Sequence, residues 1–140
     1  MPVAINVTSA FLGIAAARDA QVAAAPSSLV NVSSDAELQD SPAMHGYAAS
    51  KFALRGPTKS LALELGGDNV RANSMHPGVI QTPMTSDLDL GDRGGALGRA
   101  GEPKEVSALV VYLASEESSF QTGAEFVIDG SQTTGGSAEV

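Results

Sequence analysis

The chain has 140 residues, of which 43% are apolar, and it carries a formal net charge of −8 with no cysteine. This length fits one domain, residues 1–140, with a modest core. The acidic balance argues against a nucleic-acid partner, because a phosphate backbone would be repelled. The lack of cysteine excludes disulfides and thiolate metal sites and favours a reducing, cytoplasmic location. No apolar run is long enough to cross a bilayer, so we expect no membrane partner.

The first part of the chain predicts a helix followed by a buried strand. Apolar residues recur at helical spacing over residues 3–25, and Pro26 ends that run. Residues 28–34, with the sequence SLVNVSS, are short and β-branched, as in a strand of a parallel sheet, and a polar loop follows them. Ser34 would therefore close this strand.

A long second helix is predicted next. Ser41 and Pro42 form a good N-cap and first turn, and the helical pattern continues to Leu65, where two glycines stop it. Pro57 should remove a backbone hydrogen bond and kink this helix just after Gly56.

The second half of the chain predicts two more strands with a helix between them. Residues 69–78 form a strand that ends in a Pro-Gly pair, and a glycine-rich, acidic connection follows at residues 79–102, which we expect to be mobile. A helix starts at Pro103, and residues 124–130 form the last strand. Helices alternating with apolar strands predict an α/β fold with a parallel sheet covered on both faces.

Tyr47 and Lys51 are the first candidate site residues. They are four positions apart in a predicted helix, so their side chains share one face. Such a pair also occurs on ordinary solvated helix faces. What favours a functional role is Ser34, because ligands bind at the carboxyl ends of strands in open α/β sheets and this helix follows that strand.

Several motifs in the right order give the chain a resemblance to a known family. A serine at the end of a strand, with Tyr-x-x-x-Lys thirteen residues further on, resembles the active-site pattern of the short-chain dehydrogenase/reductases. VNVSS and YAASKFAL match that pattern closely, and HPGVIQTPMT and TGAEFVIDG resemble the family's last two strand regions. Ser131 departs from the pattern, because the family has a second glycine there.

The resemblance implies a role for each candidate residue. Tyr47 would exchange a proton with the substrate oxygen, and Ser34 would hold that oxygen. Lys51 would bind the ribose of the cofactor and supply a positive charge, which favours a phenolate over a phenol that ordinarily titrates near pH 10. Asn6, in INVTSAFLG, would hold a water molecule linked to Lys51.

The resemblance also implies a nicotinamide cofactor, NAD or NADP, with NAD slightly favoured. Besides Tyr47 and Lys51, it places the cofactor against the segment after the second strand. The residues of that segment that would contact the cofactor are Pro77, Gly78, Ile80 and Thr82.

Only the second half of the family's pattern is present. Nothing in the chain matches G-x-G-x-x-G, so the phosphate-binding turn has no counterpart. The resemblance therefore predicts the C-terminal portion of a doubly wound Rossmann-type fold, with three strands and covering helices but without the dinucleotide-fingerprint strands.

Three functions compete at this level. The first is an oxidoreductase that interconverts a secondary alcohol and a ketone, with SSFQTGAEFVIDG hinting at a 3α/20β-hydroxysteroid type. The second is a truncated, inactive chain that acts as a binding or assembly partner. A serine hydrolase using Ser34 ranks last, because it lacks both a G-x-S-x-G turn and a histidine partner. We also expect a homo-oligomer.

Four further side chains receive structural interpretations. His45 and His76 lie in different segments without a third ligand pattern, so we predict no metal site. Asp129 suggests a structural carboxylate near a strand end. Glu102, beside Pro103, is interpreted as an electrostatic contribution to a helix start.

Overall fold

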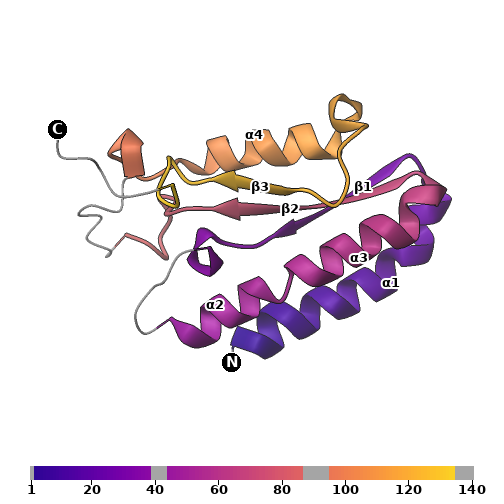
Figure 1. The fold of residues 1–140 in the computed structure, drawn as a ribbon, viewed down its shortest axis with the longest axis horizontal. Coiled ribbons are helices and arrows are strands. Elements are labelled where there is room, and N and C mark those ends of the chain that lie inside the picture. Colours follow the sequence, from indigo (N-terminus) through magenta and orange to yellow (C-terminus); the bar gives the residue numbers. More distant parts are fainter. Residues whose placement is uncertain (1, 39–43, 87–94, 135–140) are drawn as a thin grey trace.

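The structure is a computed structural model that describes residues 2–38, 44–86 and 95–134 (Figure 1). The strands are β1 (Ser27–Val32), β2 (Val70–Pro77) and β3 (Glu125–Ile128). The α-helices are α1 (Ser9–Ala23), α2 (His45–Phe52), α3 (Arg55–Leu65) and α4 (Pro103–Ala114). The shorter helical segments are η1 (Val3–Thr8), η2 (Asp35–Glu37), η3 (Gly66–Asp68) and η5 (Glu116–Ser118).

The three strands form one parallel sheet in the order β1-β2-β3. Ser27 lies opposite Val70 in the first pair, and Ser74 lies opposite Glu125 in the second. The predicted α/β fold with three parallel strands is therefore confirmed. Because all three strands run the same way, their carboxyl ends meet at one edge of the sheet, which is where the residues after β1 and β2 lie.

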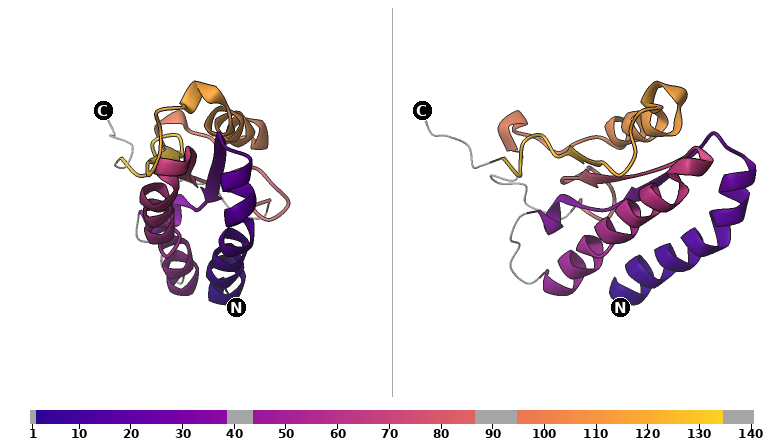
Figure 2. Two further views of the ribbon diagram at one scale, coloured as in Figure 1. Left: turned by 90° about the vertical axis from the view of Figure 1, so that its right-hand side faces the viewer. Right: turned by 45° about the vertical axis from the view of Figure 1, so that its right-hand side comes forward.

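Helices cover both faces of the sheet. Figures 1 and 2 show α1, α2 and α3 on one side and α4 on the other. The contacts agree, since α3 packs on β2, α1 on β1, and α4 on the opposite face of β1. This layering is what right-handed crossovers between parallel strands produce.

The main core lies between α3 and the sheet. Leu61 and Leu65 share one face of α3 because they are four positions apart, and they pack against Val70 and Ala72 of β2. Leu65 is 2% exposed and Val70 is 1% exposed. Burial of such side chains stabilises the fold by about 1.5–3 kcal/mol each.

The long second helix was predicted as one element, and that prediction is wrong. The structure has two helices, with a break at Ala53 and Leu54. Pro57 explains the break, because it lacks an N–H and its ring would clash with the carbonyl group of Ala53 in a continuous helix. Pro57 instead occupies the first turn of α3, where proline is tolerated, so the interruption lies before Gly56 and not after it.

Other element boundaries in the structure differ from the predicted ones by a few residues. The first helix ends at Ala23, ahead of Pro26, and its first turns over Val3–Thr8 are a π-helix. Strand β1 ends at Val32, so Ser34 lies outside it. Ser41 and Pro42, with residues 87–94 of the predicted mobile connection, lie outside the described residues.

Candidate active site

Helix α2 holds Tyr47 and Lys51 on one face at the carboxyl end of β1. The Nζ atom of Lys51 lies 5.8 Å from the centroid of the Tyr47 ring. The same Nζ donates a hydrogen bond of 3.0 Å to the carbonyl oxygen of Val32, the last residue of β1. Lys51 is thereby fixed at the sheet edge, and two of its three N–H donors are left for other partners. Within the described part of the chain, the Tyr47 hydroxyl has no hydrogen-bond partner.

Two opposing effects act on the pKa of the Lys51 ammonium group. Burial lowers the pKa of its ammonium group below the ordinary value, and the charge of Glu37 opposes that shift. The charge of Glu37 therefore offsets part of the cost of burying this ammonium group.

Ser34 lies just after β1 and caps a short turn. Its hydroxyl accepts a hydrogen bond of 3.2 Å from the Ala36 N–H and lies 3.3 Å from Oδ1 of Asp35. Helix α2 packs against this turn, so Ser34 and Tyr47 belong to neighbouring elements. Among the described residues, no hydrogen bond joins the two hydroxyl groups. The structure brings the two elements together without closing the Ser34–Tyr47 contact.

Asn6 reaches α2 from the first helical segment. Its Nδ2 donates a hydrogen bond of 3.0 Å to the hydroxyl of Ser50, which in turn donates one of 2.7 Å to the carbonyl of Tyr47. Ser50 is 1% exposed and directly precedes Lys51. Asn6 thus contacts the helix that carries both candidate side chains, in a π-helical segment of the kind often found at functional sites.

The segment after β2 is tightly packed at Gly78. The Gly78 N–H donates to the carbonyl of Ile128 at 3.0 Å, and the Val79 N–H donates to Oε1 of Gln132 at 3.1 Å. A Cβ atom at Gly78 would clash with that Gln132 oxygen and would lie 2.9 Å from the Cα of Asp129. Only glycine fits at this position without displacing backbone.

Ile80 and Thr82 lie in the next part of this segment. Ile80 forms a bridge with Gly101, which leaves the Ile80 N–H without a hydrogen-bond partner among the described residues. The Thr82 hydroxyl lies 3.2 Å from Oγ1 of Thr85, and Oγ1 of Thr85 donates to the Ile80 carbonyl at 2.5 Å. The Ile80 N–H and the Thr82 hydroxyl are therefore available to a ligand just beyond the end of β2.

The sequence did not indicate a buried cluster of polar side chains, Ser33, Glu37 and His76, next to the last turn of α2. The carboxylate of Glu37, assigned to a polar loop, lies 2.7 Å from Nδ1 of His76, and both side chains are 0% exposed. Ser33 contacts Glu37 and donates to the Lys51 carbonyl at 2.9 Å. Ser34 and Glu37 are spaced as in a capping box, which could have indicated an ordered acidic side chain here.

The remaining sequence interpretations concern structural roles. Asp129 accepts hydrogen bonds from the N–H groups of Ser131 and Thr133, and these outweigh burial and hold the pKa of its carboxyl below the ordinary value. Glu102 is the N-cap of α4, and Glu105 accepts a hydrogen bond of 2.7 Å from its N–H. These contacts agree with the structural interpretations of Asp129 and Glu102. Across residues 2–38, 44–86 and 95–134, no group of three His, Cys, Asp or Glu side chains could hold a metal ion.

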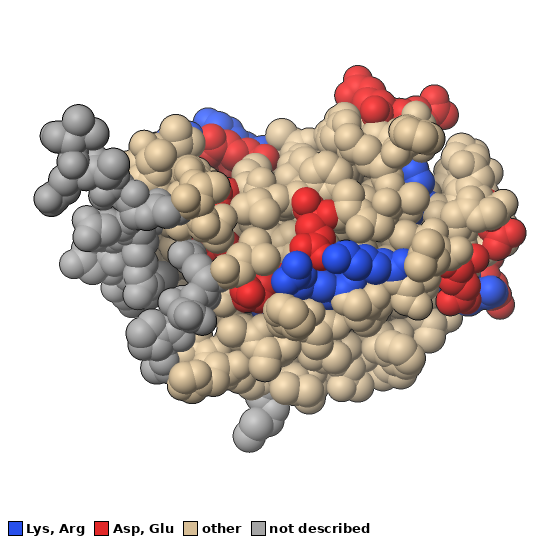
Figure 3. All heavy atoms as spheres, viewed as in Figure 1, with Lys and Arg blue, Asp and Glu red and all other residues tan. Residues whose placement is uncertain are grey.

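Basic and acidic side chains lie directly beside each other on the face shown in Figure 3. One such cluster spans α3 and β3, where Glu125 lies 2.7 Å from both Arg55 and Lys59. Arg55 also lies 4.0 Å from Glu37, so this charged cluster is next to the buried cluster of Ser33, Glu37 and His76. None of the helices in the described part of the chain is long and apolar enough to span a membrane.

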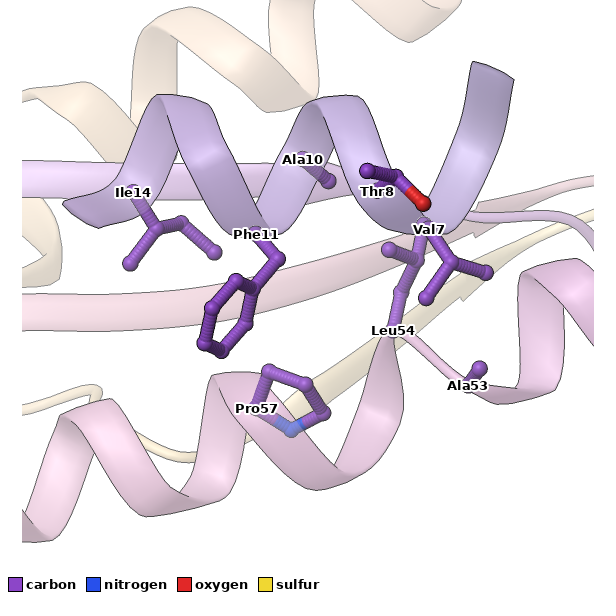
Figure 4. Close-up of a pocket in the computed structure, with 8 residues that line it drawn as sticks. All are labelled: Val7, Thr8, Ala10, Phe11, Ile14, Ala53, Leu54 and Pro57. Atoms are coloured by element: carbon purple, nitrogen blue, oxygen red, sulfur yellow. The ribbon is translucent and has the colours of Figure 1, made fainter. Parts of the chain in front are cut away.

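A cavity of about 200 Å³ lies elsewhere, between α1 and the α2–α3 junction (Figure 4). Figure 4 shows the Phe11 ring pointing toward Pro57 across it. Its lining is almost entirely apolar and includes none of the candidate site residues. The lining residues are Val7, Thr8, Ala10, Phe11, Ile14, Ala53, Leu54 and Pro57.

Comparison with known families identifies the chain. Residues 2–133 match the family model described as enoyl-(acyl carrier protein) reductase. The chain belongs to the short-chain dehydrogenase/reductase family. The fold supports this assignment, because three parallel strands with covering helices form the corresponding part of the family's Rossmann-type sheet.

Curated relatives share about half of their length with this chain. The 3-alpha-(or 20-beta)-hydroxysteroid dehydrogenase of Mycobacterium tuberculosis is 53% identical over 131 residues, which are 94% of this chain and 50% of that protein. The trans-4-hydroxycyclohexanecarboxylate dehydrogenase of Sinomonas cyclohexanicum is 47% identical over 131 residues, with the same two coverages. The chain thus spans about half the length of the curated relatives it matches.

Solved structures give the same result. A 4-hydroxyisoleucine dehydrogenase complexed with NADH superposes with a TM-score of 0.87 and 33% identity, covering 95% of this chain and 58% of that one. A 3-oxoacyl-[acyl-carrier protein] reductase with bound NAD from Brucella melitensis superposes with a TM-score of 0.86 and 38% identity, covering 94% of this chain and 50% of that one.

Proposed function

We propose that residues 1–140 form the catalytic half of an oxidoreductase that interconverts a secondary alcohol and a ketone. The observation that carries this proposal is the placement of Tyr47 and Lys51 on one face of α2, with Lys51 fixed at the carboxyl end of β1. That position is where open α/β sheets bind ligands. The relatives support the reaction class, because their names describe dehydrogenases of cyclic secondary alcohols.

In this proposal Tyr47 is the proton-transfer group. Its hydroxyl has no hydrogen-bond partner in the described part of the chain, so it is available to a substrate oxygen. Lys51 places a positive charge 5.8 Å from the ring centroid, where it would stabilise negative charge on the Tyr47 oxygen in the transition state of proton transfer. The Ser34 hydroxyl would turn its proton from Oδ1 of Asp35, to which it donates at 3.3 Å, and hold the substrate oxygen.

The cofactor would be NAD or NADP, and the residues after β2 fit such a group. The unpartnered Ile80 N–H and the Thr82 hydroxyl can bind a carboxamide, and the two remaining Lys51 donors can bind ribose hydroxyls. Pro77 ends β2 and Gly78 follows it, so this segment leaves the sheet at the carboxyl ends of the strands. A bound nicotinamide supplies the hydride acceptor or donor. NAD is favoured, because two similar solved structures contain NADH or NAD.

The proposed substrate is a cyclic or steroid-like secondary alcohol or its ketone. The names of the relatives include hydroxysteroid, cyclopentanol and cyclohexanol dehydrogenases. Asn6 would support the reaction through its hydrogen bond to Ser50 in α2. We further propose a homo-oligomer, on the basis of the exposed apolar side chains of α1, among them Phe11 and Leu12 at 63% and 61%. The proposed location is the cytoplasm, because the chain has no cysteine.

Turnover by a tyrosine variant tests this proposal. Tyr47→Phe removes the proton-transfer group and keeps the ring, so NAD-dependent oxidation of cyclohexanol should fall by at least about 100-fold. Tyr112→Phe, in α4 on the other face of the sheet, is the matched control and should retain activity. Equal turnover in Tyr47→Phe and the unsubstituted chain would refute the assignment.

A second candidate is a chain that binds or assembles with a partner but does not catalyse. The observation that favours it is that residues 1–140 contain no G-x-G-x-x-G turn for the cofactor phosphates. Calorimetry with NADH and NADPH separates the two candidates. Micromolar binding by the isolated chain would support the enzyme, and no heat at millimolar cofactor would support the binding partner.

A further inference from the structure

Two consecutive residues at the end of β1 hold Lys51 by its side chain and by its backbone. The carbonyl oxygen of Val32 accepts a hydrogen bond of 3.0 Å from Nζ of Lys51, and the Ser33 hydroxyl donates one of 2.9 Å to the Lys51 carbonyl. The next residue is Ser34, whose hydroxyl is proposed to hold the substrate oxygen. Residues 32 and 33 therefore attach α2 to the end of the strand directly beside Ser34.

Ser33 is itself held firmly in place. Its N–H donates a hydrogen bond of 2.8 Å to the carbonyl of Met75, in the centre of the sheet. Ser33 is 4% exposed and Met75 is 0% exposed. The hydroxyl also contacts the buried carboxylate of Glu37, so its one proton faces two acceptors and the side chain bridges η2 and α2. Because Ser33 is buried, water has little access to replace this bridge.

Helix α2 depends on such polar contacts for its position. It has eight residues, which is too short for a helix to be stable by itself in water. Ser50 is its one buried residue, so none of its apolar side chains is buried, and no side chain caps its N-terminus. The hydrogen bond from Asn6 holds Ser50, and the one from Ser33 holds the carbonyl of Lys51. Hydrogen bonds therefore fix the position of α2 more than apolar packing does.

We propose that Ser33 is a positioning residue, which holds α2 in place beside Ser34 so that Tyr47 and Ser34 reach the same substrate oxygen. This inference rests on the proposed function of those two hydroxyl groups. Among the described residues, no hydrogen bond joins them, so their separation depends on how their backbone segments are attached. A displacement of about 1 Å in a reacting group can lower a rate by about 100-fold.

Three serine variants test this proposal. Ser33→Ala removes the hydroxyl, and Ser33→Thr keeps it. The matched control is Ser28→Ala, because Ser28 also lies in β1 and its hydroxyl donates a hydrogen bond of 2.7 Å to the carbonyl of Leu113, in α4. Ser33→Ala and Ser28→Ala thus each remove one hydrogen bond between β1 and a covering helix, on opposite faces of the sheet (Figure 1).

NMR of the tyrosine rings measures the position of α2 without cofactor or substrate. The chain has two tyrosines, Tyr47 in α2 and Tyr112 in α4, so labelling the ring C–H groups with ¹³C gives two sets of signals. In Ser33→Ala we expect the Tyr47 signals to move by more than their line width while the Tyr112 signals stay in place. Ser28→Ala should leave the Tyr47 signals in place, and Ser33→Thr should keep them near those of the unsubstituted chain.

Turnover measures the consequence for the reaction. With cyclohexanol and NAD, kcat of Ser33→Ala should fall by about 10- to 100-fold, with KM for cyclohexanol little changed, because the variant disturbs alignment and not binding. Ser28→Ala should retain the kcat of the unsubstituted chain. Ser33→Thr should recover most of the kcat that Ser33→Ala loses, which a merely structural role for the hydroxyl would not require.

Each outcome supports the proposal or overturns it. Unmoved Tyr47 signals in a folded Ser33→Ala variant overturn it, as does a Ser28→Ala variant that moves them equally or a folded Ser33→Thr variant that resembles Ser33→Ala. If Ser33→Ala does not fold, Ser33→Cys, which is similar in size and a weaker donor, decides in its place.

Failure of the proposed function gives a different result. An unsubstituted chain without turnover would count against the oxidoreductase, and the tyrosine signals would then decide the role of Ser33 in holding α2. In an active chain, equal kcat values for Ser33→Ala and Ser28→Ala would overturn the role of Ser33 and leave the oxidoreductase proposal standing.

Discussion

Asn6 donates a hydrogen bond of 3.0 Å to the Ser50 hydroxyl, which connects the N-terminal helical segment to the helix that carries Tyr47 and Lys51. A change at Asn6 should therefore act on α2 from a distance. In Asn6→Ala the loss of one hydrogen bond should lower the free energy of unfolding by about 1 kcal/mol. It should also speed amide exchange in α2, measured by NMR.

The matched control for this variant is Asn31→Ala. Asn31 donates a comparable hydrogen bond of 2.8 Å to Thr58, in α3 and not in α2. It should cost a similar free energy and leave the α2 amides protected. Equal exchange in α2 for the two variants would contradict a specific link between Asn6 and the site.

Ser131 adopts a backbone conformation that suits glycine. Its φ angle is +74°, in the left-handed region, which costs a non-glycine residue about 1–2 kcal/mol. Glycine lacks that cost but gains freedom in the unfolded chain. We therefore expect Ser131→Gly to raise the free energy of unfolding by about 0.5 kcal/mol, measured by urea denaturation. Ser131→Ala keeps the strain and should not stabilise, and a less stable Ser131→Gly variant would refute this account.

Gly78 is required by close packing at the end of β2. A Cβ atom there would lie 2.9 Å from the Cα of Asp129, which is backbone and cannot move alone. Gly78→Ala should therefore cost about 1–3 kcal/mol of unfolding free energy. Gly13→Ala is the control, because nothing lies within 4 Å of its Cβ position and alanine favours the middle of α1 by about 0.5–1 kcal/mol. A melting temperature for Gly78→Ala at or above that of Gly13→Ala would be inconsistent with this packing.

Glu125 makes stability depend on acidity. Its hydrogen bond from Arg55 lowers the pKa of the carboxyl from 4.5 to about 2, against the opposing effect of burial, and Lys59 adds to the shift. A carboxyl whose pKa is lower in the folded state stabilises the fold above its ordinary pKa, and this contribution is lost as the pH falls from 4.5 toward 2. Glu125→Gln should therefore weaken the fall in stability over that range, followed by urea unfolding at several pH values. Glu117→Gln, an exposed control, should follow the unsubstituted chain.

Much of the fold could be predicted from the sequence. The strands are short apolar runs between breakers, so periodicity located all three within a few residues. The second helix could not be bounded in the same way, because helical spacing continues through Ala53 and Leu54 while Pro57 forbids the hydrogen bond that a continuous helix needs there.

The site shows the limit of reasoning from motifs. Tyr47 and Lys51 could be paired by their spacing alone, and the structure brings them together. The contact of Glu37 with His76 could not be predicted, because it joins residues far apart in the sequence. A charged residue in a polar loop ordinarily indicates solvent exposure, and here the turn after Ser34 directs it inward.

We propose above all that Tyr47, with the positive charge of Lys51 beside it, transfers a proton while hydride passes between a substrate carbon and a nicotinamide. The most direct measurement uses cyclohexanol deuterated at its carbinol carbon, NAD and the isolated chain, with mass spectrometry of the NADH formed. The account predicts deuterium in the NADH from the unsubstituted chain and from Tyr112→Phe, and almost none from Tyr47→Phe. Deuterated NADH formed equally by Tyr47→Phe, or its absence with the unsubstituted chain, would contradict it.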